Sequence, residues 1–140
     1  MLSLGMDIGT STVKLVLLRD GAMAKQWMAV HHGNPFVCLK KGLSTLELAM
    51  DTPLCVTGSN TEALLEQDSA IPSLGDIPAI VEGVRWIIPQ VGSVIEIGSQ
   101  GARFITDLQS RAPQFAVNEH CAGGTGSFFE DQMSRVGCKL

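Results

Sequence analysis

The sequence has few charged residues and no long apolar run, and both absences narrow what the chain can be. Only 17% of its 140 residues are charged while 45% are hydrophobic, which suits a folded core and argues against disorder. A net charge of −4 offers no basic surface for nucleic acid or an anionic membrane. No apolar stretch approaches the roughly 18 residues that a membrane helix needs. We therefore expect a folded domain whose main partner is neither nucleic acid nor membrane.

Targeting and cysteine motifs are missing as well. The first residues lack the basic start and small-residue cleavage site of a secretion signal, so we expect a cytoplasmic protein. The four cysteines include no C-x-x-C pair, which argues against a zinc ribbon and a disulfide framework. Neither the P-loop motif G-x-x-x-x-G-K-[ST] nor the dinucleotide motif G-x-G-x-x-G occurs. If the chain binds a nucleotide, it does so by another route.

The first candidate site is a glycine turn near the start. Residues 2–8 and 12–18 predict two strands around Gly9-Thr10-Ser11, and a third strand is expected at about 23–30. Gly9 would permit a tight turn whose amides face phosphate oxygens, neighbouring hydroxyls would add donors, and a carboxylate at the strand end could hold hydrated Mg²⁺. An ordinary polar hairpin is the alternative. The residues of this candidate phosphate loop are Asp7, Gly9, Thr10, Ser11, Thr12 and Lys14.

The middle of the chain predicts alternating helices and strands. Asn34-Pro35 is typical of a helix start, which places Cys38 on a helix and makes a metal site with His31 and His32 the weaker interpretation. Apolar spacing carries this predicted helix on to Met50. A strand at 52–57, a short helix after it and a helix at 76–88 complete an α/β pattern.

A second hairpin unit begins near residue 90 and repeats the pattern of the first. A strand at 91–97 leads into the turn Gly98-Ser99-Gln100-Gly101, and strands follow at 102–106 and 115–117. Glu96 takes the place that Asp7 has in the first unit, so we expect the two carboxylates on equivalent loops facing one cleft. The domains expected are a subdomain at 1–88 and the incomplete start of a second at 89–140.

The second candidate site surrounds Cys121, which precedes a glycine-rich loop and a helix. Ser127 and Glu130 fit a capping box, and Gly137 gives a stop signal. Free amides and the helix dipole would favour an anion beside the cysteine, either its own thiolate or an iron–sulfur cluster. Glycines would let the backbone approach such a ligand. A buried cysteine before a tight turn is the alternative.

Two motifs resemble a known family. Residues 118–129 resemble the N-[DE]-x-C-[AS]-[AG]-G-T-G-x-F element of the ATP-dependent activators of 2-hydroxyacyl-CoA dehydratases, relatives of the ATPase subunits of benzoyl-CoA reductase. Residues 7–14 resemble the first phosphate motif of the actin-like ATPase and sugar-kinase superfamily, which includes these activators. The resemblance implies an α/β fold of the actin-like (ribonuclease H-like) class. It also implies ATP with Mg²⁺, and a [4Fe-4S] cluster that Cys121 ligates between two subunits.

The resemblance also assigns roles around the second hairpin. It implies Glu96 and Gln100 as catalytic residues, and a metal role for Asp7 besides Cys121. The family motif D-I-G-G-Q-D corresponds to residues 96–101, where glutamate keeps the carboxylate but a serine and a glycine replace a glycine and an aspartate. These departures bear on phosphate approach and on the positioning of metal or water. Further cofactor-binding residues implied are Gly98, Ser99, Gly123, Gly124 and Thr125.

The function implied is an activase that couples ATP binding and hydrolysis to electron transfer into an acyl-CoA dehydratase or reductase. It would act as a homodimer joined through the cysteine-helix region. In the family a second cluster cysteine and an adenosine-binding segment lie further along than Leu140, so we expect these 140 residues alone to be inactive as an ATPase. The alternatives are a small-molecule kinase of the same fold, with an acidic general base, and a non-catalytic fragment that docks on an activase or dehydratase.

Overall fold

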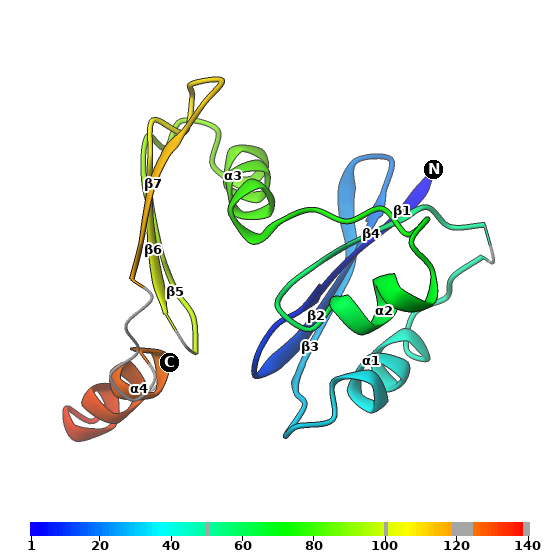
Figure 1. The fold of residues 1–140 in the computed structure, drawn as a ribbon, viewed down its shortest axis with the longest axis horizontal. Coiled ribbons are helices and arrows are strands. Elements are labelled where there is room, and N and C mark those ends of the chain that lie inside the picture. Colours follow the sequence, from blue (N-terminus) through cyan, green and yellow to red (C-terminus); the bar gives the residue numbers. More distant parts are fainter. Residues whose placement is uncertain (50, 100, 119–124, 139–140) are drawn as a thin grey trace. The chain divides into compact units, whose positions relative to one another are not determined.

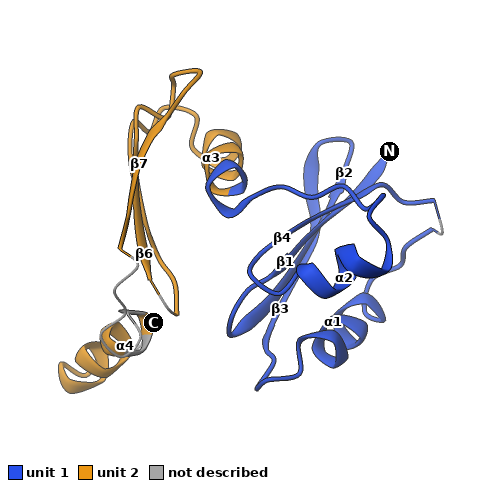
Figure 2. Cartoon of the chain, viewed as in Figure 1, with its two compact units in different colours: residues 1–79 blue, residues 80–140 orange. Residues whose placement is uncertain are grey.

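The computed structural model describes residues 1–49, 51–99, 101–118 and 125–138. It divides the chain into two compact units, called here unit 1 (residues 1–79) and unit 2 (residues 80–140) (Figure 2). The subdomain boundary expected at residue 88 stays a prediction. Helix α3, Asp76–Ile87, crosses from one unit into the other along the chain.

Unit 1 is built on a four-stranded sheet in the order β3-β2-β1-β4 (Figure 1). The first three strands form the antiparallel meander that the sequence predicts, whereas β4 pairs parallel to β1. A parallel neighbour needs a crossover connection, and helix α1 lies within it. The bounds are β1 Leu2–Ile8, β2 Thr12–Arg19, β3 Ala22–Val30, α1 Pro35–Leu43, β4 Leu54–Thr57 and α2 Glu62–Gln67.

One face of this sheet forms the core, because successive side chains of a strand point to opposite faces. Ile8, Val13 and Val56 are fully buried on that face. Residues of α1 and α2 pack against the same core cluster, so both helices cover this side (Figure 1). The opposite face carries Asp7 and Lys14, which lie directly across from each other on β1 and β2. The alternation thus places charged groups at one end of an open sheet face.

Helix α1 ends at Leu43, well before Met50, so the sequence prediction of its length is wrong. Two hydroxyls end the helix by bonding back to its last turn. Thr45 Oγ1 donates to the carbonyl of Gly42 and Ser44 Oγ to that of Lys41, both at 2.7 Å. The apolar spacing that suggested a longer helix continues because Leu46 still reaches the core from the following loop. Met50 itself lies outside the described residues.

Unit 2 contains a three-stranded antiparallel sheet in the order β5-β6-β7 (Figure 1). Ile105 and Leu108 are fully buried in this unit. Arg85 of α3 donates to the carbonyls of Leu108 and Ser110 at 2.6 Å each, which attaches the helix to the loop after β6. Across all described residues, no helix is both long and apolar enough to cross a bilayer. The strand bounds are β5 Val94–Ile97, β6 Ala102–Thr106 and β7 Gln114–Asn118, and α4 spans Thr125–Arg135.

Substituting Gly42 tests the close packing of α1 on its sheet. A Cβ at Gly42 would lie 2.6 Å from ring carbons of Trp27 and 2.7 Å from Leu15 Cδ1. Alanine favours a helix by about 1 kcal/mol over glycine, but overpacking typically costs about 1–3 kcal/mol. We expect Gly42→Ala to lower the free energy of unfolding of unit 1, measured by urea unfolding with Trp27 as the fluorescent reporter.

Gly83→Ala in α3 is the matched control. A Cβ there would meet nothing within 4 Å, so the helix propensity of alanine should raise stability by up to about 1 kcal/mol. Trp86 reports on this variant in a Trp27→Phe background, and Trp27 reports on Gly42→Ala in a Trp86→Phe background. Stabilisation by both alanines would contradict the packing described.

Candidate functional site

The turn between β1 and β2 carries an acid and a base side by side. Gly9 N–H donates to the Thr12 carbonyl at 3.0 Å and closes the hairpin. One step back along the strands, Lys14 Nζ lies 2.7 Å from Asp7 Oδ2. Both side chains are partly exposed, so the pair contributes at most about 1 kcal/mol to stability. The pair holds a carboxylate and an ammonium group beside the turn. A phosphate bound there could interact with the ammonium group and its metal ion with the carboxylate.

A second loop, Gly58-Ser59-Asn60, lies against this turn. Asp7 pairs with Thr57 in the parallel register of β1 and β4, so both chains leave the sheet at the same edge. Asn60 N–H donates to the Ile8 carbonyl at 2.9 Å, and a hydroxyl–hydroxyl bond of 2.9 Å joins Ser59 to Thr10. No motif in the sequence marks this loop as part of a binding site. The site is therefore built from two loops rather than from one hairpin.

The backbone leaves no room for a side chain at Gly58, whereas the turn at Gly9 could accommodate one. Gly58 has φ +102°, and a Cβ there would lie 2.5 Å from the Ile8 backbone and 2.6 Å from Asp7 Oδ1. A Cβ on Gly9 would make only ordinary contacts, of 3.4 Å or more, and its φ lies outside the left-handed region. Gly9 does lie in the tight turn that the sequence predicts, although neither close contacts nor a positive φ require glycine there. The absence of a side chain at Gly58 is what lets β4 leave the sheet against the Asp7 carboxylate.

His31 belongs to the site by a hydrogen bond that the sequence did not suggest. It is buried, with 8% of its surface exposed. Nε2 lies 3.2 Å from the Gly9 carbonyl, and Gly33 N–H donates to Nδ1 at 3.1 Å. Both ring nitrogens therefore have backbone partners. Cys38 lies on α1, as predicted, with Sγ 3.9 Å from the Ala29 carbonyl.

One further polar atom beside the site has no partner. The Thr57 hydroxyl is buried and makes no hydrogen bond, although a buried hydroxyl normally has one. Thr57 occupies the cross-strand row of Asp7 and Lys14.

No group of three or more histidine, cysteine or acidic residues comes together among the residues described. This donor set suits Mg²⁺ held by a single carboxylate together with water and phosphate, which is how the ion is usually bound, rather than an all-protein cage.

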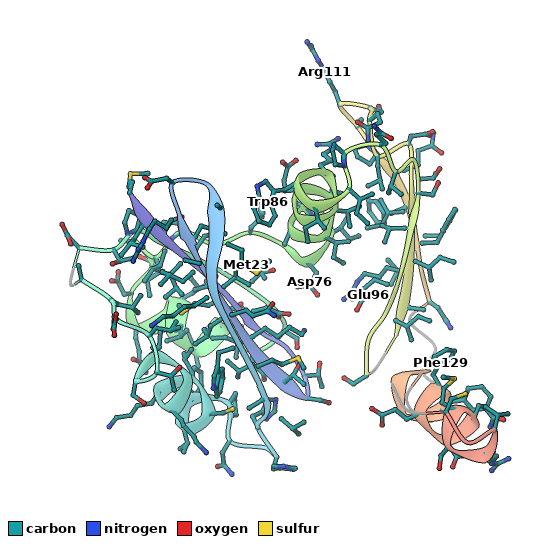
Figure 3. The ribbon with its side chains drawn as sticks, turned by 180° about the vertical axis from the view of Figure 1, so that it is seen from behind. Met23, Asp76, Trp86, Glu96, Arg111 and Phe129 are labelled. Atoms are coloured by element: carbon teal, nitrogen blue, oxygen red, sulfur yellow. The ribbon has the colours of Figure 1, made fainter. Side chains whose placement is uncertain are left out.

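The second hairpin repeats the design of the first. Arg103 Nη1 lies 2.7 Å from Glu96 Oε2, and the two residues pair across β5 and β6 just as Lys14 and Asp7 pair across β1 and β2. Gly98 N–H donates to the Gly101 carbonyl at 2.8 Å, the counterpart of the bond that closes the first turn. Glu96 projects from the sheet face that also bears Ile105 (Figure 3). The duplication read from the sequence thus extends to the ion pair and the closing bond.

The second turn also contacts the start of α4. Gly126 N–H donates to the Gly98 carbonyl at 3.0 Å, and a Cβ on Gly126 would meet that oxygen at 3.0 Å. Helix α4 begins at Thr125, so Ser127 lies within its first turn and the predicted N-cap position is wrong. Gly137 follows the helix with φ +74°, which confirms the stop signal. Gln100, Cys121, Gly123 and Gly124 lie outside the described residues, and their roles stay predictions.

Comparison with solved structures defines the class of fold as that of the actin-like ATPases. The (R)-2-hydroxyglutaryl-CoA dehydratase component A of Acidaminococcus fermentans matches 99% of this chain and 55% of its own, with a TM-score of 0.77 and 24% identity. The activator of the 2-hydroxyisocaproyl-CoA dehydratase from Clostridium difficile, solved with bound ADPNP, matches 99% of this chain and 53% of its own, with a TM-score of 0.77 and 27% identity. The predicted fold class is confirmed.

Sequence comparison confirms the resemblance to activators of 2-hydroxyacyl-CoA dehydratases. The 2-hydroxyisocaproyl-CoA dehydratase activator of Clostridioides difficile is 31% identical over 143 residues, covering 97% of this chain and 52% of its own length. The activator of lactoyl-CoA dehydratase of Anaerotignum propionicum is 29% identical over 147 residues, covering 97% and 54%. The chain thus spans about half the length of these curated relatives. No family model matches the sequence.

Replacing Gly58 tests the steric constraint between the two loops. Gly58→Ala should destabilise unit 1 and displace the Asp7 carboxylate, because the new Cβ collides with the Ile8 backbone. Gly33→Ala is the control, since Gly33 also has a positive φ, +84°, but nothing lies within 4 Å of its Cβ position.

Both variants carry backbone strain of about 1–2 kcal/mol, and only Gly58→Ala adds an overpacking cost of about 1–3 kcal/mol. Urea unfolding, followed by Trp27 fluorescence in a Trp86→Phe background, measures the difference. Equal losses of stability in the two variants would mean that the loops are not in the close contact described.

Proposed function

We propose that this chain takes part in the ATP-dependent activation of a 2-hydroxyacyl-CoA dehydratase or a related acyl-CoA reductase. The observation that carries the proposal is the pair of glycine hairpins, each with an acid and a base in cross-strand contact at 2.7 Å. The proposal is also supported by relatives named as dehydratase activators and by the ADPNP bound in one solved activator. ATP is the nucleotide we assign to the first hairpin.

The first hairpin would bind the phosphates of the nucleotide. Backbone amides and the hydroxyls of Thr10, Ser11 and Thr12 would donate to phosphate oxygens, and Lys14 would add a positive charge. Asp7 would hold Mg²⁺ through water, and the ion when bound would neutralise phosphate charge. Gly98, Ser99 and the Glu96 carboxylate would form the second phosphate loop, with Gln100 assisting hydrolysis.

The bond between Gly98 and Gly126 offers a route from nucleotide to cysteine. Gly126 belongs to the first turn of α4, the helix that follows Cys121 along the chain. Its amide donates to the Gly98 carbonyl at 3.0 Å. A phosphate that moved Gly98 would therefore move the start of α4 as well. We infer that hydrolysis would re-aim the helix and with it the Cys121 thiolate, which would hold the cluster that supplies an electron to the acyl-CoA enzyme.

Cys121 of each copy in a dimer would supply two of the four thiolates that a shared [4Fe-4S] cluster ordinarily takes, with Gly123, Gly124 and Thr125 giving it backbone access. Exposed apolar residues on α4 favour a contact surface there: Phe128 is 61% exposed and Phe129 42%. A homodimer joined through this region, in the cytoplasm, is the assembly we propose. A kinase of the same fold would leave the cysteine element without a role, so we prefer the activator.

Nucleotide binding by this chain should depend on magnesium and on Asp7. In isothermal titration calorimetry, Asp7→Asn should weaken binding of MgATP by about tenfold or more, the scale of a lost charge-assisted interaction. Asp51→Asn, which removes the same charge from an exposed loop before β4, should leave binding unchanged. Tight, magnesium-independent and adenine-selective binding would contradict this placement of the site.

The role of Cys121 is testable without a loaded cluster. A [4Fe-4S] centre ordinarily takes four thiolates, and a dimer supplies only two from this position, so anaerobic incubation of the 140-residue chain with iron and sulfide should give no stable visible absorbance.

A thiolate stabilised at the start of a helix is reactive, so air oxidation should produce a covalent dimer seen on non-reducing gels. Cys121→Ser should prevent the dimer, whereas Cys55→Ser, which removes another exposed thiol, should not. A stable cluster that survives Cys121→Ser would rule out this cysteine as the ligand.

A further inference from the structure

The Gly9 carbonyl is held by two side chains from distant parts of the chain. Asn60 Nδ2 donates to it at 2.7 Å and His31 Nε2 lies 3.2 Å from the same oxygen. Asn60 follows β4 and His31 follows β3, whereas Gly9 lies between β1 and β2. Three separate connections therefore converge on one backbone oxygen at the tip of the phosphate hairpin.

The hydrogen bonds fix the tautomer of His31. A backbone N–H can only donate, so Nδ1, which receives the Gly33 amide at 3.1 Å, carries no hydrogen. A carbonyl oxygen can only accept, so Nε2 carries the hydrogen and donates it to Gly9. The ring is buried, which limits competition from water. Both partners of Gly9 are thus donors held in place by contacts of their own, Asn60 through its backbone bond to Ile8.

Fixing the Gly9 carbonyl also fixes the direction of the Thr10 amide, because both belong to the same peptide group. The described backbone has no cis peptide bond, and in a planar trans peptide the C=O and the next N–H point in opposite directions. The amide of Thr10 therefore points away from His31 and Asn60. Val30 lies in the open-face row of the sheet, opposite Thr12, so the next residue, His31, projects toward the helix-covered face. The Thr10 amide is accordingly turned toward the side that carries Asp7 and Lys14.

We propose that His31 and Asn60 are positioning residues that aim the Thr10 amide at an oxyanion of a phosphorylated ligand. The inference rests on the proposed nucleotide site and adds the two groups that orient its turn. Two donors on the Gly9 carbonyl also polarise the peptide, which makes its N–H a stronger donor. Without these two hydrogen bonds, the Gly9–Thr10 peptide could rotate and point its carbonyl oxygen at the phosphate, which would repel it. The bonds from His31 and Asn60 prevent that rotation.

Magnesium pyrophosphate is the probe that tests the proposal, because it presents oxyanions without an adenosine group. In the ¹⁵N-labelled 140-residue chain, the Thr10 amide resonance should shift on titration. Asn60→Ala and His31→Leu should each weaken binding about three- to tenfold, the range set by the net contribution of one hydrogen bond. His31→Gln keeps a donor near the Nε2 position and should restore binding to within about twofold. His32→Gln, at the exposed neighbouring histidine, should bind as the original chain does.

Structural damage is distinguished by the resonances of the ligand-free variants. In Asn60→Ala, the Thr10 amide should shift while core amides such as that of Leu15 keep their positions. Binding unchanged in both Asn60→Ala and His31→Leu, or equal weakening by His31→Gln and His31→Leu, would overturn the proposal. If the original chain binds pyrophosphate but no ATP, the assignment of ATP fails. The positioning role of His31 and Asn60 is then tested by the pyrophosphate affinities of the variants alone. If it binds neither, both are overturned.

Discussion

The parallel pairing of β1 with β4 is the constraint on which the site depends. It brings the ends of two strands far apart in sequence to one edge of a sheet, with Asp7 opposite Thr57. The turn at Gly58 then passes so close to Ile8 that no side chain fits. From that contact follow the bonds of Ser59 and Asn60 to the hairpin tip. Loops carry chemistry well when a rigid scaffold positions them, and here the scaffold is the sheet edge itself.

The two units share a local plan that links charge to backbone geometry. In each, a carboxylate on the first strand faces a cation on the second, and a glycine amide closes the turn between them. In unit 1 the charged pair lies on the face opposite the core, whereas in unit 2 Glu96 and Arg103 share a face with the buried Ile105. In unit 2 the turn also bonds to α4 through Gly126. That bond attaches α4 directly to the turn glycine Gly98, whereas among the described residues no helix residue bonds to Gly9 in the first hairpin.

Much of this arrangement could be predicted from the sequence, for identifiable reasons. The strands follow from alternating apolar residues and the hairpins from their glycines, both of which are local patterns. The end of α1 could not be predicted from apolar spacing, because Ser44 and Thr45 end the helix while Leu46 continues the spacing from a loop. His31 and Asn60 were missed because a side chain that bonds a distant carbonyl leaves no periodic pattern. A glycine followed by two polar residues after a predicted strand was the one available signal for the second loop.

The central claim is that a nucleotide places its phosphates and metal ion at the tip formed by residues 7–12 and 58–60. Paramagnetic broadening by Mn²⁺, used in place of Mg²⁺ with ATP, measures this directly on the ¹⁵N-labelled chain. We expect the amide resonances of Gly9, Thr10 and Ser59 to broaden first. Those of Asp20 and Gly21, at the opposite end of the same strands, should stay sharp. Broadening centred on Asp20, or none that requires ATP, would contradict the account.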